Sequence, residues 1–477
     1  MKKIISLALV LMFSFCSCVK EPQNSSSGMT SFESDITSSE QNTTSNEEIQ
    51  QIASNVESKL QASSETNITN NNSKKQDSSK ITSTKKQNDV VSEKNSSVVQ
   101  NNSTKPVVSE IEPLKPSNNK NALAVSEYYG YKQLQKSGSA AEKKAYNLIS
   151  QKVENLEFEI EFDFSITADE VDRAYNFYRL DFPQHFYKGN EHTITSVAGK
   201  VKKFIFTDVL DGGDKNSIRA KIEEFNSRTK VILSKVENQN NLIEVERIIH
   251  DELVNSVRYD ETISKPYIYT AYGALVKKEA VCEGYASAFQ YLMREVGVQC
   301  IMVKGTLDLD GRSESHAWNK IELGGSYYNV DVTSDDPIMY RGSNRVDVLR
   351  FNYFNLSDAE IKKTHTFAKT ESSEPANPEA NGTKYNFFNY YGLVIDNLTP
   401  EEFAKSIAFS EKCGYDDFYF KLSSISIDSA INYILSNTGK ITSAANALIG
   451  RNAVNLTQLR YTDDTYFNIC SIEIEIH

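Results

Sequence analysis

Three short segments within residues 281–333 decide the fold of this chain. They read Val281-Cys282-Glu283-Gly284-Tyr285-Ala286, then His316-Ala317-Trp318-Asn319, then Tyr327-Tyr328-Asn329-Val330-Asp331-Val332-Thr333. A cysteine, a histidine and an acid therefore occur in that order, each at the edge of an expected helix or strand. A nucleophile, a base and a group that orients the base are the parts of an activated nucleophile.

The residues after Cys282 predict an amphipathic helix that stops at Gly297. Its apolar face repeats at helical spacing and consists of Tyr285, Phe289, Leu292, Met293 and Val296. Cys282 is thus expected at or just before the helix N-terminus, where free N–H groups and the helix dipole favour a thiolate. Gly284 leaves room for another backbone or a substrate to come close. The alternative is a buried structural cysteine.

Residues 316–323 and 326–333 predict two strands joined by the two-residue turn Gly324-Gly325. In that register Trp318 lies opposite Asp331, and Asp331 lies on the same face as His316, within hydrogen-bonding reach. A three-residue loop would instead place His316 and Asp331 on opposite faces. We expect Trp318 to pack beside the site and shield it from water, although its N–H is also a weaker candidate for binding substrate.

These motifs, with the preceding helical stretch near residues 245–260, resemble the core of the transglutaminase-like family in the papain-like thiol superfamily. The resemblance covers about residues 240–340. It implies an α+β fold with a transglutaminase-like (papain-like cysteine proteinase) core and small α+β domains flanking it. By resemblance, Cys282 is the nucleophile, His316 the general base and Asp331 the residue that orients it. The N–H of Cys282 is a natural oxyanion donor, and Tyr272 is a weak second candidate.

The chain begins with features of an exported bacterial lipoprotein. Lys2 and Lys3 precede an apolar run, and residues 1–18 form an expected signal peptide that is too short to span a membrane. Ser17 directly before Cys18 resembles a lipoprotein processing site. We therefore expect Cys18 to be lipidated and the protein to be anchored at the outer face of the cell membrane. The alternative is ordinary signal cleavage nearby without a lipid.

Composition divides the remainder of the chain. Residues 19–125 are rich in Ser, Asn and Thr and predict a disordered tether. We expect an N-terminal α+β domain at 126–236, a transglutaminase-like catalytic domain at 237–370, a linker at 371–384 and a C-terminal α+β domain at 385–477. Capping boxes predict helices that begin after Ser139 and Thr167, and Thr399-Pro400 predicts another.

The sequence predicts neither a nucleic-acid partner nor a cofactor. The net charge of −12 disfavours nucleic acid. Cysteine spacing fits no zinc pattern, and Cys300 is expected in a buried strand. A disulfide between Cys413 and Cys470 remains open. His185 and His192 lie near a tyrosine and a glutamate, but we expect ordinary surface residues there rather than a metal site.

Two functions from different classes follow from this reading. The first is an exported, lipid-anchored thiol enzyme that acts on amide bonds of peptide or protein substrates, including cell-wall peptides, through a thioester on Cys282. Water as acceptor would give hydrolysis, and an amine would give acyl transfer and cross-linking. The alternative is a non-catalytic binding or adhesion lipoprotein that uses the core as a scaffold. Because only an enzyme needs an activated thiol, a thiol-reactive probe separates the two.

Overall fold

The computed structural model describes residues 113–115, 122–341, 344–346, 348–456 and 460–476, all of which belong to one compact unit. The expected signal peptide, Cys18 and nearly all of the expected tether lie outside the described residues. Across the ranges that are described, no helix has both the length and the apolar character that a bilayer crossing requires.

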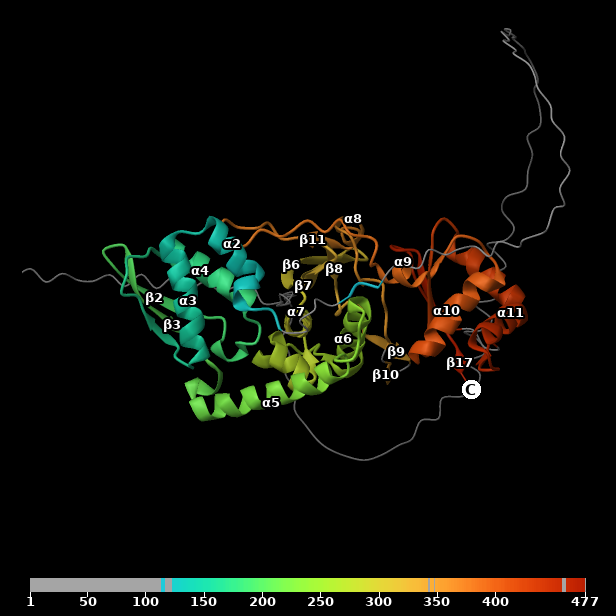
Figure 1. Ribbon diagram of the computed structural model, residues 1–477, viewed down its shortest axis with the longest axis horizontal. Coiled ribbons are helices and arrows are strands. Elements are labelled where there is room, and N and C mark those ends of the chain that lie inside the picture. Colours follow the sequence, from blue (N-terminus) through green and yellow to red (C-terminus); the bar gives the residue numbers. More distant parts are fainter. Residues whose placement is uncertain (1–112, 116–121, 342–343, 347, 457–459, 477) are drawn as a thin grey trace, which may run out of the picture. The chain divides into compact units, whose positions relative to one another are not determined.

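The N-terminal part combines helices with a three-stranded antiparallel sheet of order β1-β3-β2, around its own apolar core (Figure 1). Ser139 and Thr167 each form the expected capping box, at the start of α3 and α4. The elements are η1 (Val125–Glu127), α2 (Tyr129–Ser137), α3 (Ala140–Glu154), β1 (Glu159–Glu161), α4 (Ala168–Asp181), η2 (Phe186–Lys188), β2 (His192–Val197), β3 (Lys200–Phe206), η3 (Leu210–Gly213) and α5 (Lys215–Ser234).

Two histidines of this part are packed inside it, so the expectation of surface residues was wrong. The ring of His185 stacks on Phe182, and its Nδ1 lies 2.8 Å from the hydroxyl of Tyr178. Burial lowers the pKa of His185 to about 3, so the ring is neutral. His192 stacks on Phe204. Aromatic packing explains both positions, because the apolar faces of the rings are buried in the core.

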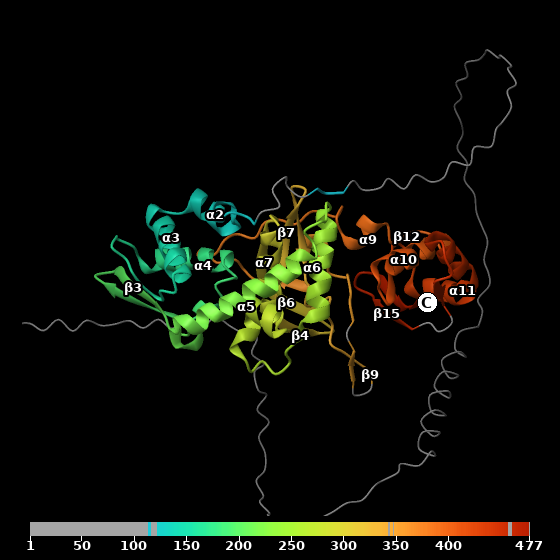
Figure 2. The same cartoon turned by 60° about the horizontal axis from the view of Figure 1, so that its bottom comes forward.

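The central part is built on a four-stranded antiparallel sheet of order β11-β6-β7-β8. Helix α7 packs against this sheet, and α6 lies beside α7 (Figure 2). The elements are α6 (Leu242–Ser256), β4 (Arg258–Tyr259), η4 (Pro266–Tyr269), η5 (Gly273–Lys277), β5 (Glu279–Ala280), α7 (Cys282–Glu295), β6 (Cys300–Leu309), β7 (Arg312–Leu323), β8 (Ser326–Val330), β9 (Met339–Arg341), β10 (Asn344–Val346), α8 (Asp358–Ile361) and β11 (His365–Phe367).

The hairpin β7–β8 has the predicted register. Leu323 pairs with Ser326 and Asn319 with Val330, so the turn contains only Gly324 and Gly325. Both glycines have positive φ, 58° and 81°, as a tight hairpin turn with matching twist requires. Strand β8 ends at Val330 rather than at residue 333.

The C-terminal part is a second α+β unit with a sheet of order β12-β13-β16-β15. Thr399 caps α10 and Pro400 opens it, as predicted. The elements are α9 (Phe387–Tyr391), β12 (Val394–Ile395), α10 (Pro400–Cys413), β13 (Asp417–Leu422), α11 (Ile427–Ile449), β14 (Val454–Asn455), β15 (Tyr461–Asp464), β16 (Ile469–Glu473) and β17 (Glu475–Ile476).

None of the four described cysteines forms a disulfide. Cys413 packs at the edge of the central core, whereas Cys470 lies within the C-terminal core. The disulfide that the sequence left open is therefore not formed. Cys300 is fully buried at the start of β6, as expected.

The segment expected to be a linker, residues 371–384, is hydrogen-bonded to the rest of the protein. The hydroxyl of Tyr129 donates to the carbonyl of Ala376 at 2.7 Å, and Lys320 Nζ donates to that of Pro378 at 2.6 Å. Ala380 is fully buried. The segment has the composition of a linker, but these contacts make it part of the wall beside the sheet.

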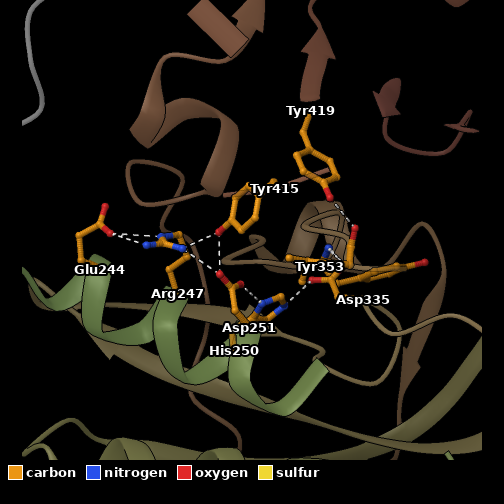
Figure 3. Close-up of polar contacts among 9 residues, drawn as sticks. Glu244, Arg247, His250, Asp251, Asp335, Tyr353, Tyr415 and Tyr419 are labelled. Atoms are coloured by element: carbon orange, nitrogen blue, oxygen red, sulfur yellow. Dashed lines mark hydrogen bonds and ion pairs between the residues drawn. The ribbon is translucent and has the colours of Figure 1, made fainter. Parts of the chain in front are cut away.

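A buried polar network joins α6 to the C-terminal part (Figure 3). Tyr415 accepts from Arg247 Nη1 and donates to Asp251 Oδ2, the latter at 2.6 Å. His250, which is fully buried, lies 3.1 Å from both Asp251 Oδ1 and Asp335 Oδ2. Burial opposes a charge on this ring, but hydrogen bonds to the two carboxylates raise the pKa of His250 to about 9.

Candidate active site

Cys282 is the first residue of α7, as the sequence predicted, and only 2% of it is exposed. Gly284 allows the helix start to meet η4, since a Cβ there would lie 2.3 Å from the carbonyl oxygen of Ile268. The close approach that Gly284 permits is therefore one of backbone to backbone. Cys282, Ala286 and Ala317, the neighbour of His316 on β7, form one buried apolar cluster. The fold thus brings the N-terminal end of α7 to the strand that carries the histidine.

His316 and Asp331 lie on the same side of the hairpin, as the register argument predicted. His316 Nε2 is 2.7 Å from Asp331 Oδ2, and both residues are buried. Because Nε2 faces the carboxylate, Nδ1 is the ring nitrogen assigned to act as a base. This arrangement fixes both the tautomer and the orientation of the imidazole.

The early end of β8 has a local cause. Asp331 Oδ1 accepts hydrogen bonds from the backbone N–H groups of Thr333 and Ser334, at 3.1 and 3.2 Å. The hydroxyl of Ser334 donates to Oδ2. These bonds turn the chain after Val330, as Asp side chains often do. The predicted strand was therefore three residues too long, although Asp331 keeps the predicted face.

A second histidine, His365 on β11, also reaches the acid. Its Nε2 lies 3.1 Å from the same oxygen, Asp331 Oδ2. Burial alone would raise the pKa of Asp331, but His316 and then His365 hold it well below the usual range. The carboxylate therefore stays ionised and orients the histidine without taking its proton.

Sequence reasoning missed His365 because the contact that places it is not local. Strand β11 has three residues and pairs with β6, where Phe367 lies opposite Gly305. A Cβ on Gly305 would lie 2.0 Å from the carbonyl oxygen of Thr366, so this glycine lets β11 come close. Gly305, the last residue of the strand expected at 298–305, was the one available signal.

Among the described residues, His316, Asp331 and His365 form the group whose ligand atoms could hold a metal ion, all within 4.8 Å of one another. The sequence predicted no metal site. The 2.7 Å contact between His316 and Asp331 is a hydrogen-bond distance. Two ligand atoms on one tetrahedral zinc would lie about 3.3 Å apart. Hydrogen bonding therefore accounts for the geometry of this group.

Trp318 packs beside the histidines. Its ring lies 6.2 Å from that of His316 at 19°, and its plane meets His365 edge-on at 4.9 Å. The indole N–H donates to Asn329 Oδ1 at 3.1 Å, and the side chain is buried. This hydrogen bond supports the packing role rather than substrate binding.

Substitution of Trp318 should separate its bulk from its N–H group. We expect Trp318→Phe to keep most activity and to cost about 1–3 kcal/mol of stability, because Asn329 Oδ1 loses its buried donor. Trp318→Ala should cost about 3–5 kcal/mol and lower turnover severely, because it opens a cavity beside His316. Thermal unfolding and turnover of both variants test this. Equal loss of turnover in both folded variants would instead make the N–H group essential.

Tyr272, the weak oxyanion candidate, has its hydroxyl turned to α5. It donates to Glu224 Oε2 at 2.8 Å, and its ring stacks on Phe186 at 4.7 Å. Its role as an oxyanion donor remains a prediction.

A pocket of about 240 Å³ lies beside the cysteine. Its wall on the central part includes Glu283, the neighbour of Cys282, and Met302, which packs against the apolar cluster that contains Cys282. Lys304, paired with Glu283 at 3.3 Å, lines it as well. Residues of α2 and α4 and the segment 368–377 complete the pocket. A ligand in this pocket would therefore lie next to the start of α7.

The described residues thus form an α+β fold in which a cysteine at the start of a helix lies in one apolar cluster with the strand that carries the histidine of a His–Asp pair. Residues 230–332 match the sequence model of the Transglutaminase-like superfamily.

Several solved structures show local similarity to this chain. A candidate cysteine protease from Cytophaga hutchinsonii is 16% identical, with coverage of 26% of this chain and 42% of the other and a TM-score of 0.21. A TGase is 12% identical, with coverage of 39% and 53% and a TM-score of 0.22. A candidate protease from Parabacteroides distasonis is 9% identical, with coverage of 34% and 41% and a TM-score of 0.18. The matched regions thus span about half of these proteins or less. No curated protein sequence matches the chain.

Proposed function

We propose that this protein is a thiol enzyme that acts on amide bonds of peptides or proteins through a thioester on Cys282. The observation that carries the proposal is the buried hydrogen bond between Asp331 and His316, which lies on the strand that packs against helix α7. A nucleophile, a base and an oriented base partner are the requirements for acyl transfer from an amide.

Each side chain has a role in the proposed reaction. The Cys282 sulfur attacks the amide carbonyl as His316 Nδ1 holds the thiol proton. The imidazolium then gives that proton to the leaving amine as the C–N bond breaks, which leaves an acyl thioester. Water or an amine, deprotonated by His316, attacks the thioester and restores the thiol. The N–H of Cys282, at the start of α7, is the proposed donor to the developing oxyanion, and Asp331 stabilises the imidazolium.

The pocket beside Cys282 is the proposed site for the substrate chain. It is lined by Tyr129, Asn176 and Leu180 from the N-terminal part and by Ile301 and Met302 from β6. Such a mixture of apolar surface and a few polar groups suits a peptide segment. The N-terminal part would then contribute to substrate choice, and wall peptides or secreted proteins are the proposed substrates.

A peptide library with a fluorescent amine acceptor tests the proposal. We expect release of new amines, or incorporation of the labelled amine, together with an acyl adduct on Cys282 that hydroxylamine removes. Cys300→Ser is the matched control, because Cys300 is also buried and outside any disulfide and should be dispensable. The proposal fails if no member of the library is converted and no adduct forms on Cys282.

One observation favours the scaffold alternative, namely that Cys282 is almost fully buried. A thiol that no reagent reaches cannot serve as a nucleophile. Labelling by a small thiol reagent therefore discriminates between the two functions. Rapid labelling of Cys282 that depends on His316 supports the enzyme, whereas labelling no faster than a model thiol supports a scaffold.

We further propose that the protein is exported and anchored by a lipid on Cys18. The support is the sequence of residues 1–18 and the polar stretch that follows. Cys18→Ala should release the protein from membranes and leave the core folded, which fractionation and thermal unfolding of the released protein would show. Cys16→Ala is the matched control and should stay with the membrane. Retention of the Cys18→Ala variant would contradict lipid anchoring.

A further inference from the structure

Two imidazole rings meet on one oxygen of Asp331. His316 Nε2 and His365 Nε2 lie 2.7 and 3.1 Å from Oδ2, and the hydroxyl of Ser334 also donates to it. The backbone N–H groups of Thr333 and Ser334 occupy Oδ1. A carboxylate has about four lone-pair sites, so this one is fully engaged. His365 therefore competes with His316 for the same negative charge.

The surroundings of His365 fix the proton on Nε2. Its Nε2 lies 3.1 Å from Asp331 Oδ2, and an ionised carboxylate only accepts, so Nε2 carries the proton. Its Nδ1 lies 2.9 Å from the hydroxyl of Thr364, and we assign that hydroxyl as a donor to Nδ1. The side chain has no exposure to solvent. Burial lowers the pKa of His365, and this outweighs Asp331, so the ring is neutral. A neutral ring that accepts at Nδ1 must donate from Nε2, toward Asp331.

The packing around His365 holds the ring in this orientation. The indole of Trp318 lies 4.9 Å away and the ring of Tyr353 5.4 Å away, both edge-on. The charged and titratable groups that act on it are Asp331, His316 and Asp308 of β6. With aromatic rings on two sides, the donor cannot turn away from the carboxylate without a rearrangement of the core.

We propose that His365 is a positioning residue that orients Asp331 and limits how strongly Asp331 retains the proton on His316. This inference rests on the proposed function. A hydrogen bond donated to a carboxylate reduces the negative charge that its other partners experience. The imidazolium of His316 is then acidic enough to release its proton to the leaving amine, since a general acid works best with a pKa near the working pH.

Titration of His316 by NMR measures this effect without a substrate. The chain has six histidines, and His316→Gln identifies the signal of interest. We expect His365→Leu to raise the titration midpoint of His316 by about 1 pH unit, because a hydrogen bond to a charged group is lost. His365→Gln is the matched control, because its amide can donate from the place of Nε2, and the midpoint should stay at the wild-type value. Thr364→Val, a milder change, should shift the midpoint in the same direction as His365→Leu.

Different results would contradict the positioning role of His365 and the proposed thiol-enzyme function. Equal His316 midpoints in the wild type and in the His365→Leu and Thr364→Val variants would overturn the role of His365, whatever the reactivity of Cys282. Metal in the purified wild type that is absent from His365→Leu, measured by elemental mass spectrometry, would overturn it as well, because His365 would then be a ligand. By contrast, alkylation of wild-type Cys282 no faster than a model thiol would refute the proposed function. That result would leave the titration comparison valid.

Discussion

Asp331→Asn should reduce turnover by about 10³- to 10⁴-fold, as loss of the orienting acid does in related triads. The amide cannot stabilise the imidazolium, and its NH₂ group would face His316 Nε2, which favours the wrong tautomer. It would also face the donor of His365, which lies 3.1 Å from Oδ2 in the wild type. Turnover of the best peptide from the library is the measurement.

Asp260→Asn is the matched control for this substitution. Asp260 is buried and accepts from the backbone N–H groups of Thr262 and Ile263, as Asp331 does from two residues that follow it. It is hydrogen-bonded to the hydroxyl of Thr262 and not to a histidine. We expect Asp260→Asn to keep turnover within about threefold of the wild type. That corresponds to a change of under about 1 kcal/mol in the activation free energy. An Asp331→Asn variant that retains a tenth or more of wild-type turnover would contradict the role given to Asp331.

His250→Gln should lower the free energy of unfolding by about 3–5 kcal/mol at pH 7. The substitution removes a buried cation and leaves Asp251 and Asp335 without their shared partner. The effect should extend to the site, because the N–H of Asp335 donates to the carbonyl oxygen of Asp331 at 3.2 Å. Urea unfolding followed by circular dichroism measures the change.

The raised pKa of His250 also predicts how the stability of the protein depends on pH. The pKa of His250 is raised to about 9 in the folded chain, against about 6.5 when unfolded. Its contribution is therefore complete below about pH 6.5 and is lost as the pH rises through about 9. The shift corresponds to about 3 kcal/mol. Wild-type stability should fall between pH 7 and pH 10, and the fall should be smaller in His250→Gln.

His192→Gln is the control for the pH effect. Its side chain is also mostly buried, but its carboxylate partner, Asp172, is 3.9 Å away. The substitution should keep the fall near pH 9. A wild-type protein with the same stability at pH 7 and pH 10 would show that His250 is not held as a buried cation.

Local sequence patterns predicted the parts of the site that neighbouring residues determine. The two glycines of the β7–β8 turn fix its length, and the period of two in a strand then fixes which side chains share a face. The helix pattern after Cys282 placed that residue at a helix start for the same reason. The end of β8 was misplaced because the side chain of Asp331 hydrogen-bonds to the backbone that follows it.

Contacts between distant segments could not be predicted. His365 meets Asp331 through a three-residue strand whose pairing depends on Gly305 in β6. His250 and Tyr415 belong to segments that lack a shared motif, and they meet across the interface between α6 and the C-terminal part (Figure 3). Single-sequence patterns report periodicity and capping, whereas these contacts arise only from packing.

The rate of alkylation of Cys282 by iodoacetamide as a function of pH tests the central claim most directly. A thiolate stabilised by the start of α7 and by an oriented histidine should react at pH 6 at least about ten times faster than a model thiol, which is mostly protonated there because its pKa is about 8.5. His316→Gln should remove this advantage. A wild-type rate that rises only through about pH 8.5, as for an ordinary thiol, would contradict the assignment of Cys282 as the nucleophile.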